Sequence, residues 1–398
     1  MPTRPNLLDP RVRANPYPLY ACLRRERPVC EIEPGGLWAV SRYDDVVYAL
    51  RHPELFSSSG FRVFLTPPWL DHNPAAESLV MCDPPDHTRL RAFVSRAFSP
   101  RTLAPIEARI RTVASELADR VVARGEVDVV DEFAGALPTR IIAEVLGLDP
   151  ALGVHFKRWV NDQAVISPAI TDPVRIAEIK TSIHELVSYL DEAIEARRRA
   201  PSDDLVGELM RPDASGQLLT EDELRSFLVV LLVAGLETST ALLSSTLRLL
   251  AERPADLQHL RQDPAFIPAY LEEVLRYEPP AHGLARLTTQ EVELGGTRLA
   301  AGSVVLVLLG SANRDENYFP EPDRFDPGRS NQKAVAFGYG IHSCVGAVLA
   351  RMEGRIGLKA LLERVAHIAP VPGEIRWNES LVSRCPIALP LRFESAST

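Results

Sequence analysis

The residues best suited to chemistry lie in a glycine-rich loop around Cys344, within residues 336–351. Gly338 and Gly340 allow a tight turn with positive φ, so the loop can place Cys344 at the N-terminus of the helix that follows. Backbone N–H groups and the positive end of the helix dipole lower the pKa of a thiol in that position. The thiolate is the form of cysteine that binds a metal. The loop therefore predicts a thiolate ligand, and Gly346 leaves room for a flat ligand near the backbone.

Three other interpretations of this loop are weaker. A lone cysteine is most often a small buried hydrophobic residue, but such a residue would not require a Gly-x-Gly turn with Phe337 and His342 nearby. A cysteine nucleophile would need a geometry that His342, only two residues away, does not obviously provide. Residues 338–343 are close to a dinucleotide-binding fingerprint, but Ser343 replaces the third glycine and no βαβ pattern surrounds it.

A second group of polar residues lies in the middle of a long predicted helix. The capping box at residues 220–223 and the absence of proline before Pro254 predict a helix of about 30 residues, roughly 45 Å long. Its centre is apolar almost all round, which indicates burial. Gly235 and residues 237–240 stand out there. Close packing and hydroxyls bonded to backbone carbonyls would explain most of them, but a buried acid beside a hydroxyl also suits a proton relay.

A shorter helix, predicted over residues 265–277, carries Glu273 and Arg276 three residues apart on one face. It is expected to stop at Glu278, because prolines follow. Taken alone, such a pair is usually a solvated surface pair, and only its context can give it another role.

The chain that must position these residues has 398 residues, of which 46% are hydrophobic and 24% charged, enough for a sizeable core. No linker, repeat or low-complexity tract divides it, so we expect a single domain over residues 1–398. The 33 prolines punctuate segments with apolar residues at three- and four-residue spacing. This pattern predicts a mainly α-helical fold, with small β-sheets from residues 36–41, 292–299 and 304–309.

Charge and cysteine content exclude several classes of protein. The net charge of −9 argues against nucleic-acid binding. The N-terminus has no basic region followed by an apolar core, and apolar runs such as residues 227–236 are shorter than the ~18–20 residues of a membrane span. Five cysteines without a CxxC pair argue against a disulfide framework or a cysteine zinc site. We therefore expect a cytoplasmic protein with no membrane anchor.

Together these motifs resemble those of the cytochrome P450 family, the haem-thiolate monooxygenases, in their soluble bacterial form. Residues 337–351, FGYGIHSCVGAVLAR, match that family's F-G-x-G-x-H-x-C-x-G-x-x-L-A-R at every fixed position. AGLET at residues 234–238 is similar to its A/G-G-x-D/E-T, and residues 273–276 match its E-x-x-R. Residues 322–325 match the segment that supplies a second arginine, and residues 83–91 match an early helix that holds haem. The resemblance covers essentially the whole chain. It implies the P450 fold, with a long central helix over the haem and the cysteine loop on the proximal side.

The resemblance implies haem b (iron protoporphyrin IX) as the cofactor, O2 as co-substrate, and Cys344 as the axial thiolate and metal ligand. A thiolate donates electron density to haem iron and favours cleavage of the O–O bond. By the same resemblance, the residues around the haem and its propionates are His87, Arg91, Ala234, Gly235, Arg286, Phe337, Gly338, His342, Cys344 and Gly346. Glu237 and Thr238 would be the catalytic residues that relay protons, in a helix loosened at Gly235.

Glu273, Arg276 and Arg324 resemble the family's buried triad behind the haem, which serves folding more than catalysis. By family position, the substrate pocket is formed mostly by apolar side chains, namely Phe61, Phe64, Leu65, Trp69, Val230, Val233, Ala281, His282, Leu284 and Val382. Such a lining suggests an apolar, medium-sized substrate of the terpenoid, steroid, fatty acid or polyketide type, with His282 as a polar handle. Ordinary loop packing would explain the aromatic residues among them equally well.

The chain has no flavin, nicotinamide or iron–sulfur motif, so electrons from NAD(P)H would arrive through partner proteins. The resemblance implies that these partners are a ferredoxin and a ferredoxin reductase, and that this protein is a monomer. The ferredoxin would dock on the cysteine side of the protein, at a basic patch formed by Arg89, Arg96, Arg351, Arg355 and Lys359.

We expect a monooxygenase that inserts one oxygen atom from O2 into its substrate. Two alternatives stay open: the same fold acting as a peroxygenase, isomerase or dehydratase, and a haem-binding sensor without turnover. Relatives of the first kind often lose the acid and the threonine of the long helix. Both are present here as Glu237 and Thr238, which favours the monooxygenase.

Overall fold

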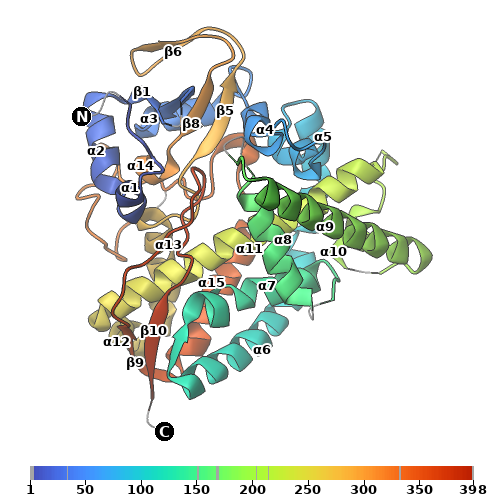
Figure 1. The fold of residues 1–398 in the computed structure, drawn as a ribbon. Coiled ribbons are helices and arrows are strands. Elements are labelled where there is room, and N and C mark those ends of the chain that lie inside the picture. The colour runs from blue at the N-terminus through green and yellow to red at the C-terminus, as the bar shows by residue number, and fades with distance from the viewer. Residues whose placement is uncertain are drawn as a thin grey trace. The chain divides into compact units, whose positions relative to one another are not determined.

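The computed structural model describes residues 4–33, 35–149, 152–166, 170–202, 204–213, 215–330 and 333–396. The chain forms two compact units. Unit 1 comprises Met1–Ser57, Ile110–Leu137 and Thr238–Thr398, and unit 2 comprises Ser58–Arg109 and Pro138–Glu237. Both units are drawn in Figure 1.

Unit 1 is built on a five-stranded sheet with the strand order β1-β2-β8-β5-β3. Its strands β1, β8 and β5 are labelled in Figure 1. Its strands are β1 (Val29–Ile32), β2 (Leu37–Val40), β3 (Phe56–Ser57), β5 (Leu284–Thr288) and β8 (Val304–Val307). β2 and β8 pair in parallel, and the other neighbours are antiparallel. Helix α3 (Tyr43–Arg51) covers the sheet, because its buried Val46 and Val47 share a core with Val305 and Val307 of β8.

Two smaller sheets complete the β-structure of unit 1. β6 (Val292–Leu294) and β7 (Thr297–Leu299) form a hairpin whose two turn residues, Gly295 and Gly296, have positive φ. A pair of glycines is typical of such a two-residue turn. The other sheet has the order β4-β10-β9, in which β10 (Pro390–Ser395) pairs with both neighbours. Its outer strands are β4 (Glu126–Asp128) and β9 (Val365–Pro370).

The remaining elements of unit 1 are helical. They are α1 (Pro10–Ala14), α2 (Tyr17–Glu26), η4 (Val130–Ala134), α12 (Pro254–Gln262), η6 (Pro264–Phe266), α13 (Ile267–Tyr277), α14 (Leu309–Ala312), η7 (Gly340–His342) and α15 (Ala347–Leu362). α13 begins two residues later than the sequence predicts, because residues 264–266 form a separate 3₁₀ turn, and it ends at Tyr277 as expected.

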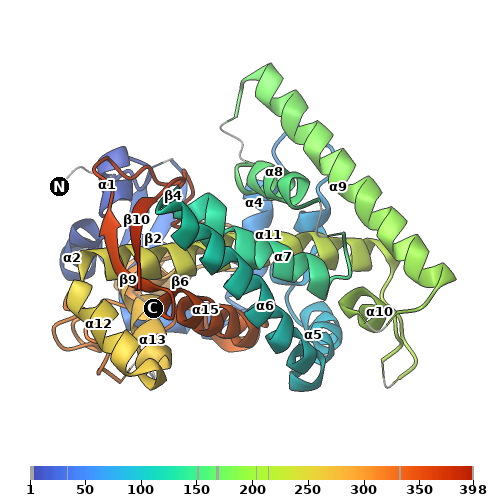
Figure 2. The same cartoon turned by 90° about the horizontal axis from the view of Figure 1, so that it is seen from below.

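The described elements of unit 2 are all helices. Its elements are η1 (Ser58–Phe61), α4 (Arg62–Leu65), η2 (Pro74–Glu77), η3 (Leu79–Met81), α5 (Asp86–Ala97), α8 (Gly153–Ala164), α9 (Pro173–Arg199) and α10 (Leu205–Leu209). α8 and α9 lie side by side (Figure 2). A small core of Ile166, Ile179 and Ile183 is buried near the end of α8 and the start of α9.

Three helices continue from one unit into the other: α6 (Pro100–Arg124), α7 (Ala136–Val145) and α11 (Glu221–Glu252). α11 is the predicted long helix, and its capping box is confirmed. The Thr220 hydroxyl oxygen accepts from the N–H of Glu223 at 3.2 Å, and the Glu223 carboxylate accepts from the N–H of Thr220 at 2.9 Å.

Within the described part of the chain, only α11 is long and apolar enough to cross a membrane, by length and composition alone. Just over half of its most apolar stretch is buried inside the protein, as in the core helix of a soluble protein, so this finding is weak evidence for a membrane span.

The predicted fold class, mainly α with small β-sheets, is confirmed. The predicted strand segments correspond to β2, β6, β7 and β8.

Candidate functional site

The cysteine loop of unit 1 is closed by backbone hydrogen bonds. The N–H of Cys344 donates to the carbonyl of Phe337 at 2.9 Å, and the N–H of Gly338 donates to the carbonyl of Val335 at 2.9 Å. Gly338 and Gly340 have φ of 72° and 73°, so the predicted positive φ is confirmed at both. A Cβ on Gly340 would lie 2.7 Å from the carbonyl oxygen of Leu50 in α3, so the loop admits only glycine there.

Cys344 lies just before the N-terminus of α15. The helix begins at Ala347 with Gly346 as its N-cap residue. A Cβ on Gly346 would lie 3.9 Å from the Cys344 sulfur, so the thiol stands close to the first turn. Its exposure is unusual, because a free cysteine is usually buried.

Two predicted propionate ligands lie in unit 1. Arg286 is buried on β5, where it stands opposite Val305 of β8 and donates to the carbonyl of Ala285 at 2.8 Å. His342 is half-buried at the end of η7, two residues before Cys344. The chain thus brings His342 and Cys344 together in one loop, while a separate strand supplies Arg286.

The other predicted haem residues belong to unit 2. His87 and Arg91 lie four residues apart on α5, His87 buried and Arg91 half-buried. Ala234 is exposed in the otherwise largely buried α11, and Gly235 follows it. A Cβ on Gly235 would lie 3.3 Å from the Ile142 side chain, so the glycine permits close packing of α11 on α7.

The expected loosening of α11 at Gly235 is wrong. The helix is a continuous α-helix from Glu221 to Glu252, with no break at Gly235 or at Glu237 and Thr238. Tight packing against the neighbouring side chain accounts for the glycine instead, since a larger residue would be crowded there. Glu237 and Thr238 are both half-buried.

A buried acid that the sequence analysis missed lies next to this segment. Glu353 of α15 is buried and bonds to the hydroxyl of Ser239, the residue after Thr238. Burial raises the pKa of Glu353 to about 8, although the Ser239 hydroxyl opposes the shift. The Oε2 atom of Glu353 has no hydrogen-bond partner within the described residues. The only sequence signal was an acid at an otherwise apolar position of a helix.

Glu273 and Arg276 form a fully buried ion pair. The Nε of Arg276 donates to one carboxylate oxygen of Glu273 at 2.8 Å, and its Nη2 donates to the other at 2.7 Å. Arg276 also donates to the carbonyls of Asn313, Pro322 and Arg324. The pair therefore anchors the loop after α14 to α13.

The assignment of Arg324 to the triad requires a correction. Its side chain is 60% exposed and pairs with Glu321 and Asp326, and only its backbone carbonyl contacts Arg276. Arg329 lies instead beside Glu273, with its Nε 3.7 Å from the carboxylate and its side chain 10% exposed. The chain turns after Phe325 in a way that the local sequence does not reveal.

The predicted substrate residues of unit 2 are half-buried. Phe61, Phe64 and Leu65 lie on the consecutive elements η1 and α4, and Val230 and Val233 lie on α11. Trp69 packs against the small isoleucine core near α8 and α9. This contact supports the loop-packing interpretation for Trp69.

The predicted substrate residues of unit 1 are brought together by an isolated β-bridge between Ala281 and Ser383. Beside it, the N–H of His282 donates to the carbonyl of Val382 at 2.8 Å, and Leu284 begins β5. The ring of His282 is buried, with its Nδ1 3.2 Å from the Tyr20 hydroxyl. Burial, followed by nearby arginines, lowers its pKa well below the usual value, so the ring is neutral. His282 thus faces α2, which disfavours the role of a substrate handle.

Several cations of the predicted basic patch are already paired. In unit 2, Arg89 pairs with Glu223 and Arg96 with Glu208. In unit 1, Arg351 pairs with Glu272 and also lies over the Phe337 ring, at 4.4 Å from its centroid. Lys359 lies 3.9 Å from Glu363 on the same helix. These acids reduce the positive potential that the arginines and the lysine create.

The residues of each unit fit a haem. In unit 1, the exposed thiol of Cys344 is a soft donor suited to haem iron, and Arg286 is a buried cation suited to a propionate. In unit 2, His87 and Arg91 present two further donors on α5, and the exposed Ala234 offers a small apolar surface for a flat ring.

Known proteins of one family resemble this chain in sequence and in structure. The sequence matches the family described as Cytochrome P450 over residues 162–376. The 6-deoxyerythronolide B hydroxylase of Saccharopolyspora erythraea is 36% identical over 408 residues, 99% of this chain and 100% of that protein. The structure of CYP109Q5 from Chondromyces apiculatus superposes with a TM-score of 0.92 at 40% identity, covering 100% of both chains. That of CYP109E1 from Bacillus megaterium in complex with corticosterone has a TM-score of 0.85 at 33% identity, covering 96% of this chain and 99% of that one.

The fold and the thiol-bearing loop define a haem-thiolate protein. The chain belongs to the cytochrome P450 family, and it is an oxidoreductase of the P450 monooxygenase class. Haem with a cysteine thiolate, together with O2, is what this family uses.

Proposed function

We propose that this enzyme inserts one oxygen atom from O2 into an apolar, medium-sized organic substrate, as one catalytic domain over residues 1–398. The observation that carries the proposal is the exposed thiol of Cys344, held by the Gly-x-Gly turn at the N-terminus of α15. Haem bound there supplies the iron at which O2 is activated and the thiolate bond that favours O–O cleavage.

We assign the binding of the haem to the residues predicted from the sequence. Cys344 holds the iron, and His87, Arg91, Arg286 and His342 bind the propionates through charge-assisted hydrogen bonds. The buried Glu273–Arg276 pair holds the segment around Arg324 in place.

Proton delivery is assigned to α11. The carboxyl group of Glu237 exchanges protons with solvent, and the hydroxyl of Thr238 passes a proton onward and orients water. Glu353, held by Ser239 one residue further along, keeps a proton at neutral pH because its pKa is raised. The hydrogen bond with Glu353 fixes the position of the Ser239 hydroxyl, next to Thr238.

The substrate is proposed to be of terpenoid, steroid, fatty acid or polyketide type, because the predicted lining side chains are almost all apolar. Two relatives support this range, one a hydroxylase of 6-deoxyerythronolide B and the other solved with corticosterone. Since His282 faces α2 and the other predicted lining side chains are all apolar, the substrate is held by shape.

Electrons are proposed to come from NAD(P)H through a ferredoxin reductase and a ferredoxin, which docks on a monomeric enzyme in the cytoplasm. Ile341 in the cysteine loop and Val348 in the first turn of α15 are exposed. Since Arg351 is already paired with Glu272, apolar contact at these two residues contributes to docking along with Arg355 and Lys359.

The proposal is tested with purified protein and two cysteine variants. The reduced protein with carbon monoxide should show the long-wavelength Soret band of thiolate ligation, and Cys344→Ser should lose it. Cys22→Ser, which changes a half-exposed cysteine elsewhere, should keep it. A Cys344→Ser variant with an unchanged band would overturn the assignment.

Turnover then separates the function from its alternatives. A panel of terpenoids, steroids, fatty acids and macrolides is titrated against the haem spectrum, and the best binder is incubated with reduced ferredoxin and O2. Product that contains one oxygen atom from labelled O2 supports the monooxygenase. Product formed from peroxide alone, or binding without product, would favour the peroxygenase or the sensor.

A further inference from the structure

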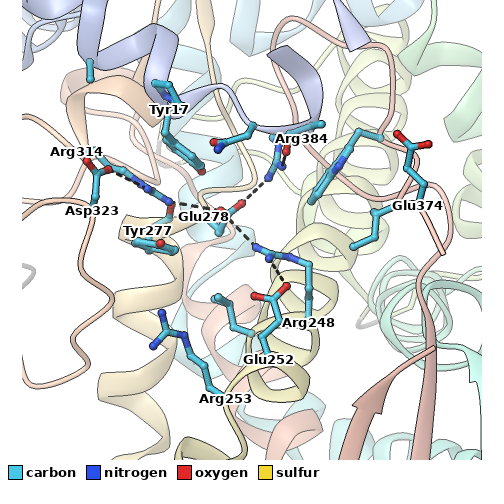
Figure 3. Close-up of a pocket in the computed structure, with 17 residues that line it drawn as sticks. Tyr17, Arg248, Glu252, Arg253, Tyr277, Glu278, Arg314, Asp323, Glu374 and Arg384 are labelled. Atoms are coloured by element: carbon cyan, nitrogen blue, oxygen red, sulfur yellow. Dashed lines mark hydrogen bonds and ion pairs between the residues drawn. The ribbon is translucent and has the colours of Figure 1, made fainter. Parts of the chain in front are cut away.

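A cavity of about 750 Å³ in unit 1 is rich in arginine (Figure 3). It is lined by residues of α1 and α2, by the C-terminal ends of α11 and α13, and by residues that follow α14 and β9. Four guanidinium groups face it, those of Arg248, Arg253, Arg314 and Arg384. None of the residues assigned above to haem or substrate lines this cavity, so the proposed function leaves it unexplained.

Three of the arginines share one buried carboxylate. Glu278 accepts a hydrogen bond from Arg384 at 2.5 Å. The carboxylate also lies 3.3 Å from the Nη2 of Arg248 and 3.5 Å from the Nη2 of Arg314. The four side chains are between 4% and 14% exposed. The inner wall therefore carries three buried positive charges and one buried negative charge.

The other acids at this cavity lie toward solvent. Glu252 pairs with Arg248 at 2.8 Å, and its side chain is 45% exposed. Asp323 pairs with Arg314 at 3.1 Å, and its side chain is 67% exposed. Glu374 is exposed as well. Water screens charges in such positions, so these acids balance the buried arginines only weakly.

Within the described residues, three donors at the cavity can still form an ion pair or a hydrogen bond. Arg253 forms no ion pair there and lies over the Phe325 ring, at 4.9 Å from its centroid. The buried Tyr17 hydroxyl and the buried Nε of Arg248 have no hydrogen-bond partner. Arg314 lies against the Tyr17 ring at 3.3 Å, which holds that hydroxyl in place. Buried donors of this kind normally meet an acceptor, so a ligand with acceptor atoms fits here.

We propose that this cavity binds a phosphate group, either as inorganic phosphate or as the monoester of a small organic molecule. Guanidinium groups pair with phosphate oxygens through two parallel hydrogen bonds, and a dianion offsets the buried positive charge. Three or more oxygens suit several donors at once, whereas a carboxylate offers two. The volume lies in the range of small-molecule pockets and exceeds that of phosphate alone, which leaves room for the organic part of an ester.

The test is calorimetric titration of the haem-loaded enzyme with inorganic phosphate and with phenyl phosphate, at constant ionic strength. Both should bind with one-to-one saturation. Tighter binding of phenyl phosphate assigns the site to an ester, and equal binding assigns it to inorganic phosphate. Arg253→Gln should weaken binding roughly tenfold, because it removes a charge-assisted contact without disturbing the Glu278 cluster. Tyr17→Phe, which keeps the ring against Arg314, should weaken it several-fold.

The matched control is Arg298→Gln, which removes one positive charge from an exposed side chain outside the cavity and should leave the affinity unchanged. The proposal is overturned if neither phosphate saturates at millimolar concentration, or if potassium chloride produces the same heat. It is also overturned if Arg253→Gln and Tyr17→Phe both bind as tightly as the parent protein while circular dichroism shows them folded.

Discussion

The guanidinium of Arg329 lies 3.7 Å from the carboxylate of Glu273, with which Arg276 already forms two hydrogen bonds. One fully buried carboxylate is thus flanked by two arginines, and the N–H of Asp326 donates to it at 2.8 Å. A buried carboxylate needs this degree of compensation, because burial without partners is costly for a charged group.

This arrangement predicts different consequences for two arginines in one loop. Arg329→Gln should lower the free energy of unfolding by about 1–3 kcal/mol, because it removes a cation beside a buried charge. Arg324→Gln should change it by less than about 0.5 kcal/mol, because that side chain is exposed. Urea denaturation of both variants measures the difference. A larger loss for Arg324→Gln would restore Arg324 to the triad.

Removing the carboxylate itself should be more damaging. Glu273→Ala leaves Arg276 fully buried without its anion, at a cost of roughly 3–5 kcal/mol, and we expect protein without haem. The haem absorbance per mole of protein measures this. Glu272→Ala is the matched control, because its side chain lies on the same helix but is only half-buried and pairs with Arg351. Normal haem content in Glu273→Ala would refute the structural role of the pair.

Thr238→Ala tests the proton relay. The variant should keep haem and substrate binding but divert electrons to hydrogen peroxide, since the hydroxyl that passes the proton is absent. Product and peroxide per NAD(P)H consumed give the coupling. Thr246→Ala removes a hydroxyl from the same helix, where it donates to the carbonyl of Leu242 at 2.7 Å, and should leave the coupling intact. Equal coupling in Thr238→Ala and the parent enzyme would count against the relay.

Glu353 makes stability depend on pH. Its pKa is raised to about 8 in the folded protein, from an ordinary value of 4.5, so the folded state holds a proton that the unfolded state releases. The contribution of Glu353 to the free energy of unfolding is therefore fully present below pH 4.5. It is lost as pH rises toward 8, at up to about 1.4 kcal/mol per pH unit.

Glu353→Gln should flatten this dependence, because glutamine keeps the shape and does not titrate. Urea denaturation at several pH values between 5 and 8 compares it with the parent and with Glu363→Gln, an exposed acid that follows the same helix. An unchanged slope in Glu353→Gln would show that the carboxyl is ionised in the folded protein.

The sequence by itself determined the features that depend on neighbouring residues. The turn with two positive-φ glycines before Cys344, the capping box of α11 and the hairpin at Gly295 follow from local backbone preferences. The motif around Cys344 was specific enough to indicate the family, since residues 337–351 match it at every fixed position.

Only the tertiary structure decided which charged groups are buried. Arg324 and Arg329 lie five residues apart in one loop, and the chain path alone decides which of them faces Glu273. Glu353 has a raised pKa because α15 packs it away from water, and the neighbouring sequence does not predict this burial. Similarly, Glu278 gathers arginines from segments far apart in the sequence. Burial and charge pairing are sums over distant contacts, and for that reason they appear only once the chain has folded.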